Sequence, residues 1–554
     1  MRKICTLLAT AMLSLAMMPS ALAQVNVGGV AFNNDMVGWG DLYNLSFTTH
    51  NYGTARSMAM GNAFTALGAD MSSASINPAG IGMYFENDVS LTPMMQFVRS
   101  NTPQADPFNT DEFSNSSNRF GMASIGGVAT VYRGTGALTN FNIGFVYNRI
   151  ADFNQNYKFA SWGNKATNSM ANALCTMSNA DGLQTDSDGR MSFGNDPYYW
   201  GAVLAYKNGL TNKDDLGWYI DRIGLDAEVD QYTAVETRGS IGEFAIPFGF
   251  NFMDVFYIGA TLGIQSLEYK HNVFYGENYL YPNGYPSGSE MPYQLEYMNY
   301  MQSTRISGTG VNFKVGMTVR PLPWLRIGAA YHTRTAYNLS LRYYADMWSS
   351  TYSAGSNPDG YDLDKNGYTS DYVESPEWED AGEYAWCISS PSRLMVGVAF
   401  TIAQRIILSA DYEASFYKDM RLRRSPIYNL DYADVVNEQF RTSNTLRVGA
   451  ELRALPFLDV RLGYIFSDGG LSNGNQIFSH PLITRENYLT AGLGFKLSRS
   501  TYLDFAYQYN NRERTWYQSF YAVDSFDSNL NIEAEPVRTN TSRHLAVLTL
   551  GFRF

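Results

Sequence analysis

Residues 500–513 read Ser-Thr-Tyr-Leu-Asp-Phe-Ala-Tyr-Gln-Tyr-Asn-Asn-Arg-Glu, and residues 544–554 read His-Leu-Ala-Val-Leu-Thr-Leu-Gly-Phe-Arg-Phe. In both stretches every second residue is apolar or aromatic, as in Leu503, Phe505, Tyr507 and Tyr509. Successive side chains of a strand point to opposite faces, so this period of two predicts strands with one apolar and one polar face.

The same alternation recurs from about residue 86 to residue 554, and its polar positions carry Gly, Asn and charged residues. It predicts fourteen strands, near residues 86–99, 119–132, 138–153, 239–253, 255–271, 302–320, 324–344, 389–402, 405–417, 441–454, 457–468, 484–497, 500–513 and 541–554.

The lengths of the linkers between these strands distinguish a membrane barrel from a soluble β-sandwich. They alternate between tight turns and long polar stretches, the long ones near 100–118, 155–238, 273–300, 345–388, 418–440, 469–483 and 515–540. Compact soluble domains rarely hold so many long loops, whereas outer-membrane barrels have short turns at one end and long loops at the other. A spanning sheet must also close on itself to satisfy its backbone hydrogen bonds. We therefore predict an all-β fold: a transmembrane antiparallel β-barrel of about 14 strands.

The composition agrees with this fold class. Charged residues are 17% of the chain and aromatic residues 15%, which excludes a highly charged disordered chain and suits the aromatic girdles of a barrel. The polar faces predict an inward set of ions that pair with each other or hold a plug, with a substrate path along them as the alternative. These residues are Lys314, Arg326, Arg334, Arg405, Asp411, Glu413, Arg447, Glu451, Arg453, Asp459, Arg461, Lys496, Asp504 and Arg553.

The N-terminal residues predict export. Arg2 and Lys3 precede an apolar run over residues 4–18, and Ala21-Leu22-Ala23 fits a cleavage site, so residues 1–23 read as a signal peptide. Without them the chain has 38 basic and 52 acidic residues, a net charge of −14, which argues against nucleic acid as a partner. We expect a multi-pass protein of a Gram-negative outer membrane, surrounded by its lipids. The terminal aromatic strand fits recognition by the barrel assembly machinery.

Residues 24–85 lack the strand period and precede the predicted barrel of residues 86–554. They are rich in Gly, Ala, Ser and Met, and most of these side chains are too small to form a hydrophobic core of their own. We therefore expect this segment to pack inside the barrel as a hatch. Asn77-Pro78 favours an extended residue before the proline, and Gly80 allows a turn after it.

This segment carries a motif whose predicted hatch residues are Gly53, Arg56, Gly61, Asp70, Asn77, Pro78, Ala79 and Gly80, with Ala69 directly before Asp70. On these residues the chain resembles the FadL/TodX-type outer-membrane transporters of long-chain fatty acids and other hydrophobic compounds. The resemblance implies a fourteen-stranded barrel with an N-terminal hatch that carries an Asn-Pro-Ala motif and gates passive uptake. It also implies helical outer loops, but residues 155–238 and 273–300 show no helical pattern, so we predict no loop helices there.

Two other functions stay open: a general porin for polar solutes, and a surface receptor or adhesin that uses its long loops. An enzyme is not expected, because the five histidines are scattered and no G-x-S-x-G or phosphate-binding loop is present. We predict no catalytic residues and no cofactor, with one reservation. Asp362, Asp364 and Asn366 match the first half of a calcium loop, although Val373 stands where its glutamate belongs. Whether Cys175 and Cys387 form a disulfide stays open.

Overall fold

The computed structural model describes residues 30–32, 44–46, 51–103, 112–179, 191, 199–214, 216–223, 227–282, 295–351, 368–374, 385–423, 440–472, 485–522, 532–534 and 536–554. The predicted signal peptide and the candidate calcium residues Asp362, Asp364 and Asn366 lie outside these ranges.

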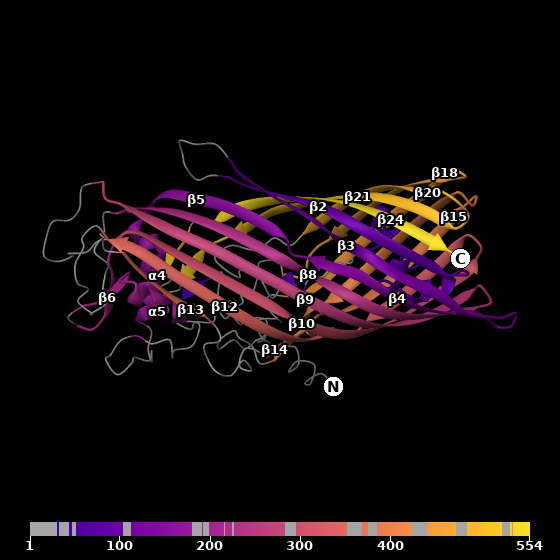
Figure 1. The fold of residues 1–554 in the computed structure, drawn as a ribbon, viewed down its shortest axis with the longest axis horizontal. Helices are drawn as coiled ribbons and strands as arrows, with labels where there is room; N and C mark the ends of the chain where they lie inside the picture. The colour runs from indigo at the N-terminus through magenta and orange to yellow at the C-terminus, as the bar shows by residue number, and fades with distance from the viewer. Residues whose placement is uncertain are drawn as a thin grey trace, which may run out of the picture.

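The described strands form a closed antiparallel barrel of 14 strands, which confirms the predicted fold class (Figure 1). In ring order they are β2 (Asp88–Pro103), β3 (Glu112–Arg133), β4 (Leu138–Asp152), β8 (Glu228–Phe252), β9 (Phe256–Leu280), β10 (Leu295–Leu322), β11 with β12 (Leu325–His332, Ala336–Thr351), β15 with β14 (Ser392–Ile402, Ala385–Ser389), β16 with β17 (Ile406–Phe416, Arg421–Arg423), β18 (Thr442–Leu455), β19 (Leu458–Ser467), β20 (Glu486–Lys496), β21 (Thr501–Tyr517) and β24 (Val537–Arg553). β24 pairs with β2 and closes the ring.

The tight turns lie at one end of the barrel and the long connections at the other (Figure 1). In the half nearer the turns, the outward face of the strands is apolar and exposed, as at Ile264, Val311, Phe313, Leu446, Phe505 and Leu548. The inward face there is polar and buried, as at Thr261, Asn312, Lys314 and Arg447. Such a belt is stable against lipid tails, so this half is the membrane-spanning part.

The polarity of the two faces reverses along the long strands. On β9 the outward residues change from Ile264 to Glu268 and Lys270, while the inward residues change from Gln265 to Leu267 and Tyr269. The outer medium therefore changes from lipid to water, and the interior changes from polar to apolar. The strands continue beyond the membrane as an extension with a core of its own.

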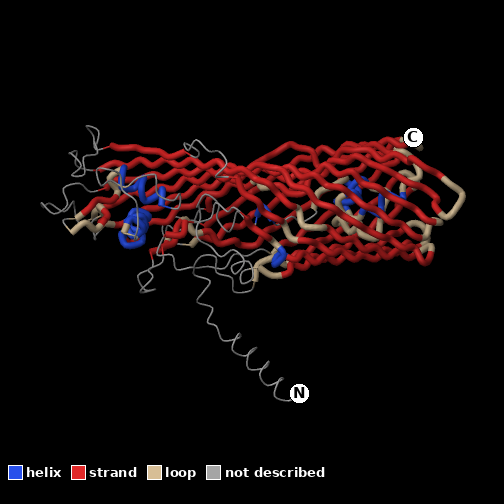
Figure 2. Tube along the Cα trace, turned by 90° about the horizontal axis from the view of Figure 1, so that it is seen from below, coloured by secondary structure: helices blue, strands red, loops and turns tan. Residues whose placement is uncertain are grey.

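The extension encloses two helices, α4 (Met170–Ser178) and α5 (Trp200–Lys207), which correct the prediction that residues 155–238 hold no helix. Figure 2 shows helices both in the barrel near the turns and near the loop end. α5 is buried on nearly every side, and α4 leaves only Asn172 and Thr176 less buried, so neither sequence carries a broad polar face. Within the described ranges, no helix is long and apolar enough to cross a membrane.

The strands also reach further out than the alternation predicts. β8 begins at Glu228 and β9 ends at Leu280, within stretches expected to be loops. The prediction was wrong there because the apolar residues switch faces at the membrane boundary, which interrupts a period judged on one face.

Candidate functional site

Residues 51–85, named the plug from here on, lie inside the membrane-spanning half of the barrel. They form α3 (Ala55–Ala59) and two short 3₁₀ helices, η2 (Met71–Ala74) and η3 (Pro78–Met83). Each begins at a capping side chain: Thr54 for α3, Asp70 for η2 and Asn77 for η3. These caps satisfy backbone N–H groups that a short helix leaves without partners.

The structure brings all eight predicted hatch residues together in the plug. Besides the caps Asp70 and Asn77, Gly61 has a φ of 62°, which favours glycine. A Cβ on Gly53 would overlap Ser72, and one on Gly80 would lie 2.9 Å from the Cβ of Ser73. Pro78 and Ala79 are the first residues of η3 and are buried. Their gating role stays a prediction.

Glycines on the wall allow the plug backbone to touch the strands. A Cβ atom on any of eight inward glycines would meet the plug, and several of these glycines are direct cross-strand partners. They are Gly249, Gly259, Gly316, Gly328, Gly397, Gly449, Gly463 and Gly492. The plug therefore reaches the wall on several sides without intervening side chains.

Polar wall residues hold the plug backbone between these glycines. The carboxylate of Asp411 accepts from the N–H of Thr65 at 2.7 Å, and His332 contacts the carbonyl of Ile76 at 2.8 Å. Ser409 and Thr490 donate to carbonyls of the plug, and Thr549 accepts from the N–H of Ala55 at 2.7 Å. Irregular backbone inside a membrane needs such partners.

Ion pairs complete the attachment. Arg56 of the plug pairs with Glu451 of β18 at 3.1 Å, and Glu451 also pairs with Arg461 at 2.7 Å. On the other side, Glu243 pairs with Lys314 at 2.5 Å and accepts from Ser75 of the plug at 2.7 Å. The prediction that inward ions pair with each other or hold a plug agrees with these contacts. Five of the predicted ions, however, are exposed, because they lie near the turns or in the break between β11 and β12: Arg334, Arg405, Arg453, Lys496 and Arg553.

β4 separates from β3 above the plug, while it stays paired with β8 as far as Asp152. Its ladder with β3 stops at the pair Ser124 and Asn148, and residues 148–152 are buried on both faces. β5 (Gln155–Lys165) continues the path on the inner side of β2, where the inward-facing Thr102 donates to the carbonyl of Lys158. Residues 112–123 of β3 therefore lack a ladder partner on this side, and this break in the ladder between β3 and β4 is called the breach from here on.

Two arginines cross this breach. Arg149 donates to the carbonyl of Met122 at 3.1 Å and pairs with Asp152 at 2.9 Å, while Arg119 donates to Asn154 at 2.6 Å. Side chains rather than backbone bonds thus join the two strands. The breach borders the apolar belt, since Phe120 of β3 is 71% exposed.

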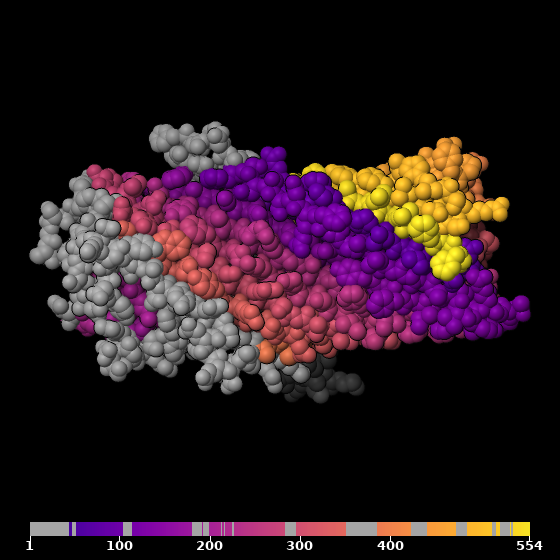
Figure 3. Space-filling model, viewed as in Figure 1, coloured from indigo at the N-terminus to yellow at the C-terminus, as the bar shows by residue number. Residues whose placement is uncertain are grey.

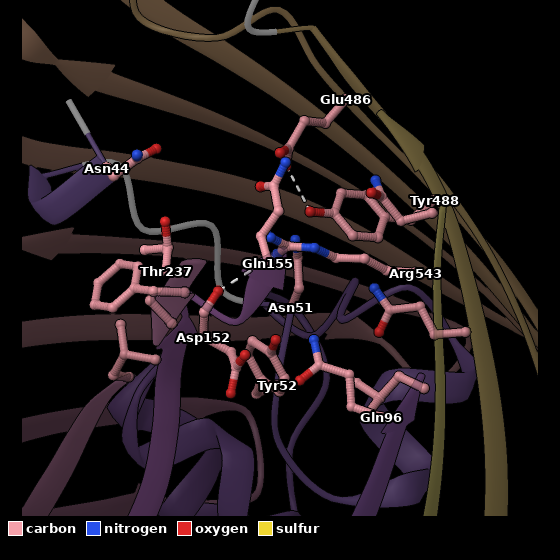
Figure 4. Close-up of a pocket in the computed structure, with 16 residues that line it drawn as sticks. Asn44, Asn51, Tyr52, Gln96, Asp152, Gln155, Thr237, Glu486, Tyr488 and Arg543 are labelled. Carbon is pink, nitrogen blue, oxygen red and sulfur yellow. Dashed lines mark hydrogen bonds between the residues drawn. The ribbon is translucent and has the colours of Figure 1, made fainter. Parts of the chain in front are cut away.

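A cavity of about 90 Å³ lies on the inner side of the bent segment (Figure 4). Ile150, Phe153 and Leu545 give it apolar walls. Polar groups lie beside them: Tyr52 and Asn51 of the plug, Gln96, Asp152, Glu486, Tyr488, Gln508 and Arg543. Figure 4 shows Arg543 reaching toward Asp152, whose carbonyl accepts from it at 3.4 Å. Among the described residues the Nε of Arg543 has no hydrogen-bond partner.

Beyond the cavity the interior of the extension is apolar. Its core includes Tyr269, Tyr300, Ile306, Leu339, Leu341 and Trp386 from the strands, with α4 and α5 packed against them. At the opposite end of the barrel, by the turn at residues 497–501, a second cavity of about 470 Å³ is lined mainly by charged groups, among them Arg56, Asp70 and Arg553.

Solved structures with a similar chain path include the Pseudomonas putida toluene transporter TodX. It superposes with a TM-score of 0.51 at 12% identity, over 91% of this chain and 99% of TodX. This chain has the fold of TodX. A TodX deltaS2S3 mutant gives a TM-score of 0.50 at 12% identity, over 91% of this chain and 100% of its own. A Pseudomonas aeruginosa FadL homologue gives 0.49 at 14% identity, over 92% and 99%. No family model and no curated protein sequence matches the chain.

The resemblance to FadL/TodX-type proteins is thus confirmed as a likeness of fold. TodX is a transporter by its description. Among the described residues, no group of three His, Cys, Asp or Glu could hold a metal ion.

The sequence did not single out the bend, the breach or Arg543. No sequence motif indicates them, because Arg149 and Arg543 lie 394 positions apart in the chain and only the fold brings both to Asp152. Cys175 and Cys387, left open above, are both free thiols. Burial raises the pKa of the Cys175 thiol to about 12.

Proposed function

We propose that this protein is an outer-membrane channel for passive, plug-gated uptake of hydrophobic compounds such as long-chain fatty acids. The observation that carries the proposal is the apolar interior of the extension, whose outer face is polar. A water-filled pore would instead be lined with polar side chains. The transfer of an apolar solute from water to an apolar environment lowers its free energy. This interior therefore favours the capture of apolar solutes at the loop end.

The plug argues against a general porin. Residues of the plug touch the wall from β8 and β9 on one side to β20 on another, through Gly249, Gly259 and Gly492. A segment held in this way obstructs an aqueous path through the membrane-spanning half. Passage therefore requires the plug to move or the ligand to leave through the wall.

The cavity beside β4 is a candidate binding site for the ligand above the plug. Its volume of about 90 Å³ is below the ~150 Å³ of a cavity that admits benzene. A larger ligand needs a rearrangement of the plug residues Asn51 and Tyr52 or of β4. The breach gives such a ligand a lateral exit toward the lipid, and no energy source is needed for movement down a gradient.

Arg543 supports fatty acids within this class. Its guanidinium stands beside apolar wall residues, and its Nε has no partner among the described residues. A charge-assisted hydrogen bond to a carboxylate would satisfy it. The neighbour TodX, a toluene transporter by its description, supports hydrophobic compounds as the broader class.

Uptake by proteoliposomes tests the proposal. Purified protein is reconstituted, and entry of a fluorescent fatty acid and of a neutral sugar is followed, with ion conductance measured in planar bilayers. We expect fatty acid uptake without sugar uptake and with low conductance. A large steady current with sugar uptake would indicate a porin. Unchanged fatty acid uptake after deletion of residues 53–80 would rule out gating by the plug.

The calcium loop at Asp362, Asp364 and Asn366 stays a separate proposal that rests on sequence alone. Calcium titration of the full protein, compared with a variant in which both aspartates are asparagine, tests it. Equal calorimetric signals from the two proteins would end it.

A further inference from the structure

Four cations stand in one cross-strand row on the outward face of the extension. Arg238 of β8 lies opposite Lys270 of β9, Lys270 lies opposite Arg305 of β10, and Arg305 lies opposite Arg342 of β12. All four residues are exposed. With neighbouring strands about 4.8 Å apart, the row is about 14 Å long.

Like charges that face each other across strands destabilise a sheet. A bound anion would relieve the repulsion within this row. Two carboxylates lie near it: Glu236 pairs with Arg238, and Glu268 pairs with Arg305 at 2.9 Å. Lys270 and Arg342 have no ion-pair partner among the described residues. Four cations against two anions leave local positive charge on a chain whose net charge is negative.

The height of the row places it at the membrane surface. The last apolar row of the belt joins Phe244, Ile264 and Val311, six residues below the cations on each strand. Two rows of small, polar or acidic residues lie between them, including Ser266, Thr309, Ser240 and Ser307. Six residues span about 20 Å along a strand, or about 15 Å of height at a tilt of ~40°. The row therefore lies in the sugar and phosphate layer outside the hydrocarbon.

Aromatic side chains follow further out on the same face. Tyr232 contacts Phe274 with ring centroids 5.8 Å apart, and Phe274 contacts Trp348 at 5.9 Å. All three are partly exposed. The outward face of β8, β9 and β10 is turned toward the viewer in the middle of the space-filling view (Figure 3). Aromatic faces pack well on sugar rings because both present flat apolar surfaces.

We propose that this face binds the anionic sugar region of lipopolysaccharide: the four cations bind its phosphate and carboxylate groups, and the aromatic side chains pack on the sugars above. Both features lie on one surface, in the order in which an outer-leaflet glycolipid presents charge and sugar. The proposal rests on the outer-membrane location proposed above but not on transport.

Retention of lipopolysaccharide by the purified protein tests this site. The test variant carries Arg238→Gln, Lys270→Gln, Arg305→Gln and Arg342→Gln. The control variant carries Arg133→Gln, Arg405→Gln, Arg453→Gln and Arg499→Gln, four exposed arginines at the turn end, so both lose the same charge. Folding of each is checked by heat-dependent migration in SDS gels, and bound lipopolysaccharide is titrated in detergent.

We expect wild type and control to bind lipopolysaccharide equally, and the test variant to bind about 600-fold more weakly, since each of the four cations near anionic lipid contributes about fivefold. Phosphatase-treated lipopolysaccharide should bind wild type more weakly, and inorganic phosphate should not compete. Equal binding by both variants would overturn the site. So would equal, row-dependent binding of phosphatidylglycerol vesicles, or competition by phosphate alone. Because bound lipid is the readout, none of these outcomes depends on uptake.

Discussion

Asn77 of the plug lies directly against Gly316 of β10, so closely that a Cβ atom on residue 316 would overlap the Asn77 Oδ1 atom. The amide of Asn77 also donates to the Oγ1 of Thr318 at 3.2 Å, and its Oδ1 accepts from the N–H of Ala79 at 3.1 Å. One side chain thus caps η3 and joins it to the wall. A single added carbon at residue 316 would therefore displace the Asn77 side chain.

Gly316→Ala should loosen the plug without unfolding the barrel. The added methyl pushes Asn77 away from Thr318, and such overpacking costs about 1–3 kcal/mol. We expect a higher and noisier ion conductance in planar bilayers, with normal heat-dependent migration in gels. Gly127→Ala is the matched control, because a Cβ there meets only Val89 at 3.3 Å and a carbonyl at 3.5 Å. Equal conductance of the two variants would contradict a plug held at Gly316.

Gly121→Phe should slow the uptake of hydrophobic ligands several-fold if they leave through the breach. A Cβ on Gly121 lies 3.3 Å from the guanidinium of Arg149, so a phenyl ring there fills the space between β3 and β4. Gly127→Phe adds the same ring on the lipid-facing side of β3 and should have no effect. The measurement is the initial rate in proteoliposomes. An unchanged uptake rate for Gly121→Phe would show that the ligand leaves past the plug and not through the breach.

Arg543→Gln should weaken fatty acid binding while leaving neutral ligands unaffected. A hydrogen bond to a charged group contributes about 1.5–3 kcal/mol, so we expect a Kd for the fatty acid roughly 10- to 100-fold higher. Toluene and the matching fatty alcohol are the internal controls, because neither has a carboxylate. Equal weakening for all three ligands would show that the substitution disturbs the cavity rather than a charge contact.

Glu277→Gln should make the stability of the extension less dependent on pH. Glu277 lies outside the membrane-spanning half and is fully buried, where its carboxylate accepts from Tyr275, Tyr279, Gln231 and the N–H of Met170 at the start of α4. Burial raises its pKa above the ordinary value, although these hydrogen bonds lower it in part.

The sign follows from this direction. The folded protein holds the proton more tightly than the unfolded chain, whose glutamate has a pKa of about 4.3. The contribution of Glu277 to stability is therefore complete below about pH 4 and is lost as the pH rises through the raised pKa. Thermal unfolding from pH 4 to 8 should show a smaller loss of Tm in Glu277→Gln. Glu277→Ala should be less stable by about 1–3 kcal/mol at every pH, because it leaves buried donors unpaired. A parallel loss in wild type and Glu277→Gln would contradict the assignment.

The alternation predicted the barrel well because lipid acts on every outward residue of the belt in the same way. Positions such as Val311, Phe313 and Leu548 must be apolar whatever their neighbours are, so a local period identifies them. The plug was predicted for a related reason: small residues around Asn77 and Pro78 exclude an independent core. Helices α4 and α5 were missed because they are short and mostly buried, so no broad apolar-and-polar pattern marks them in the sequence.

By itself, therefore, the sequence determined the fold class, the strand number and the segment that fills the lumen. Tertiary structure alone decided where β4 separates from β3 and that Arg543 lies beside Asp152. It also decided the strand registers that bring Arg238, Lys270, Arg305 and Arg342 into one row. The physical reason is that each residue's own polarity decides whether it faces the lipid or the interior, so this property can be read locally. A strand register or a breach depends instead on hydrogen bonds between segments far apart in the chain.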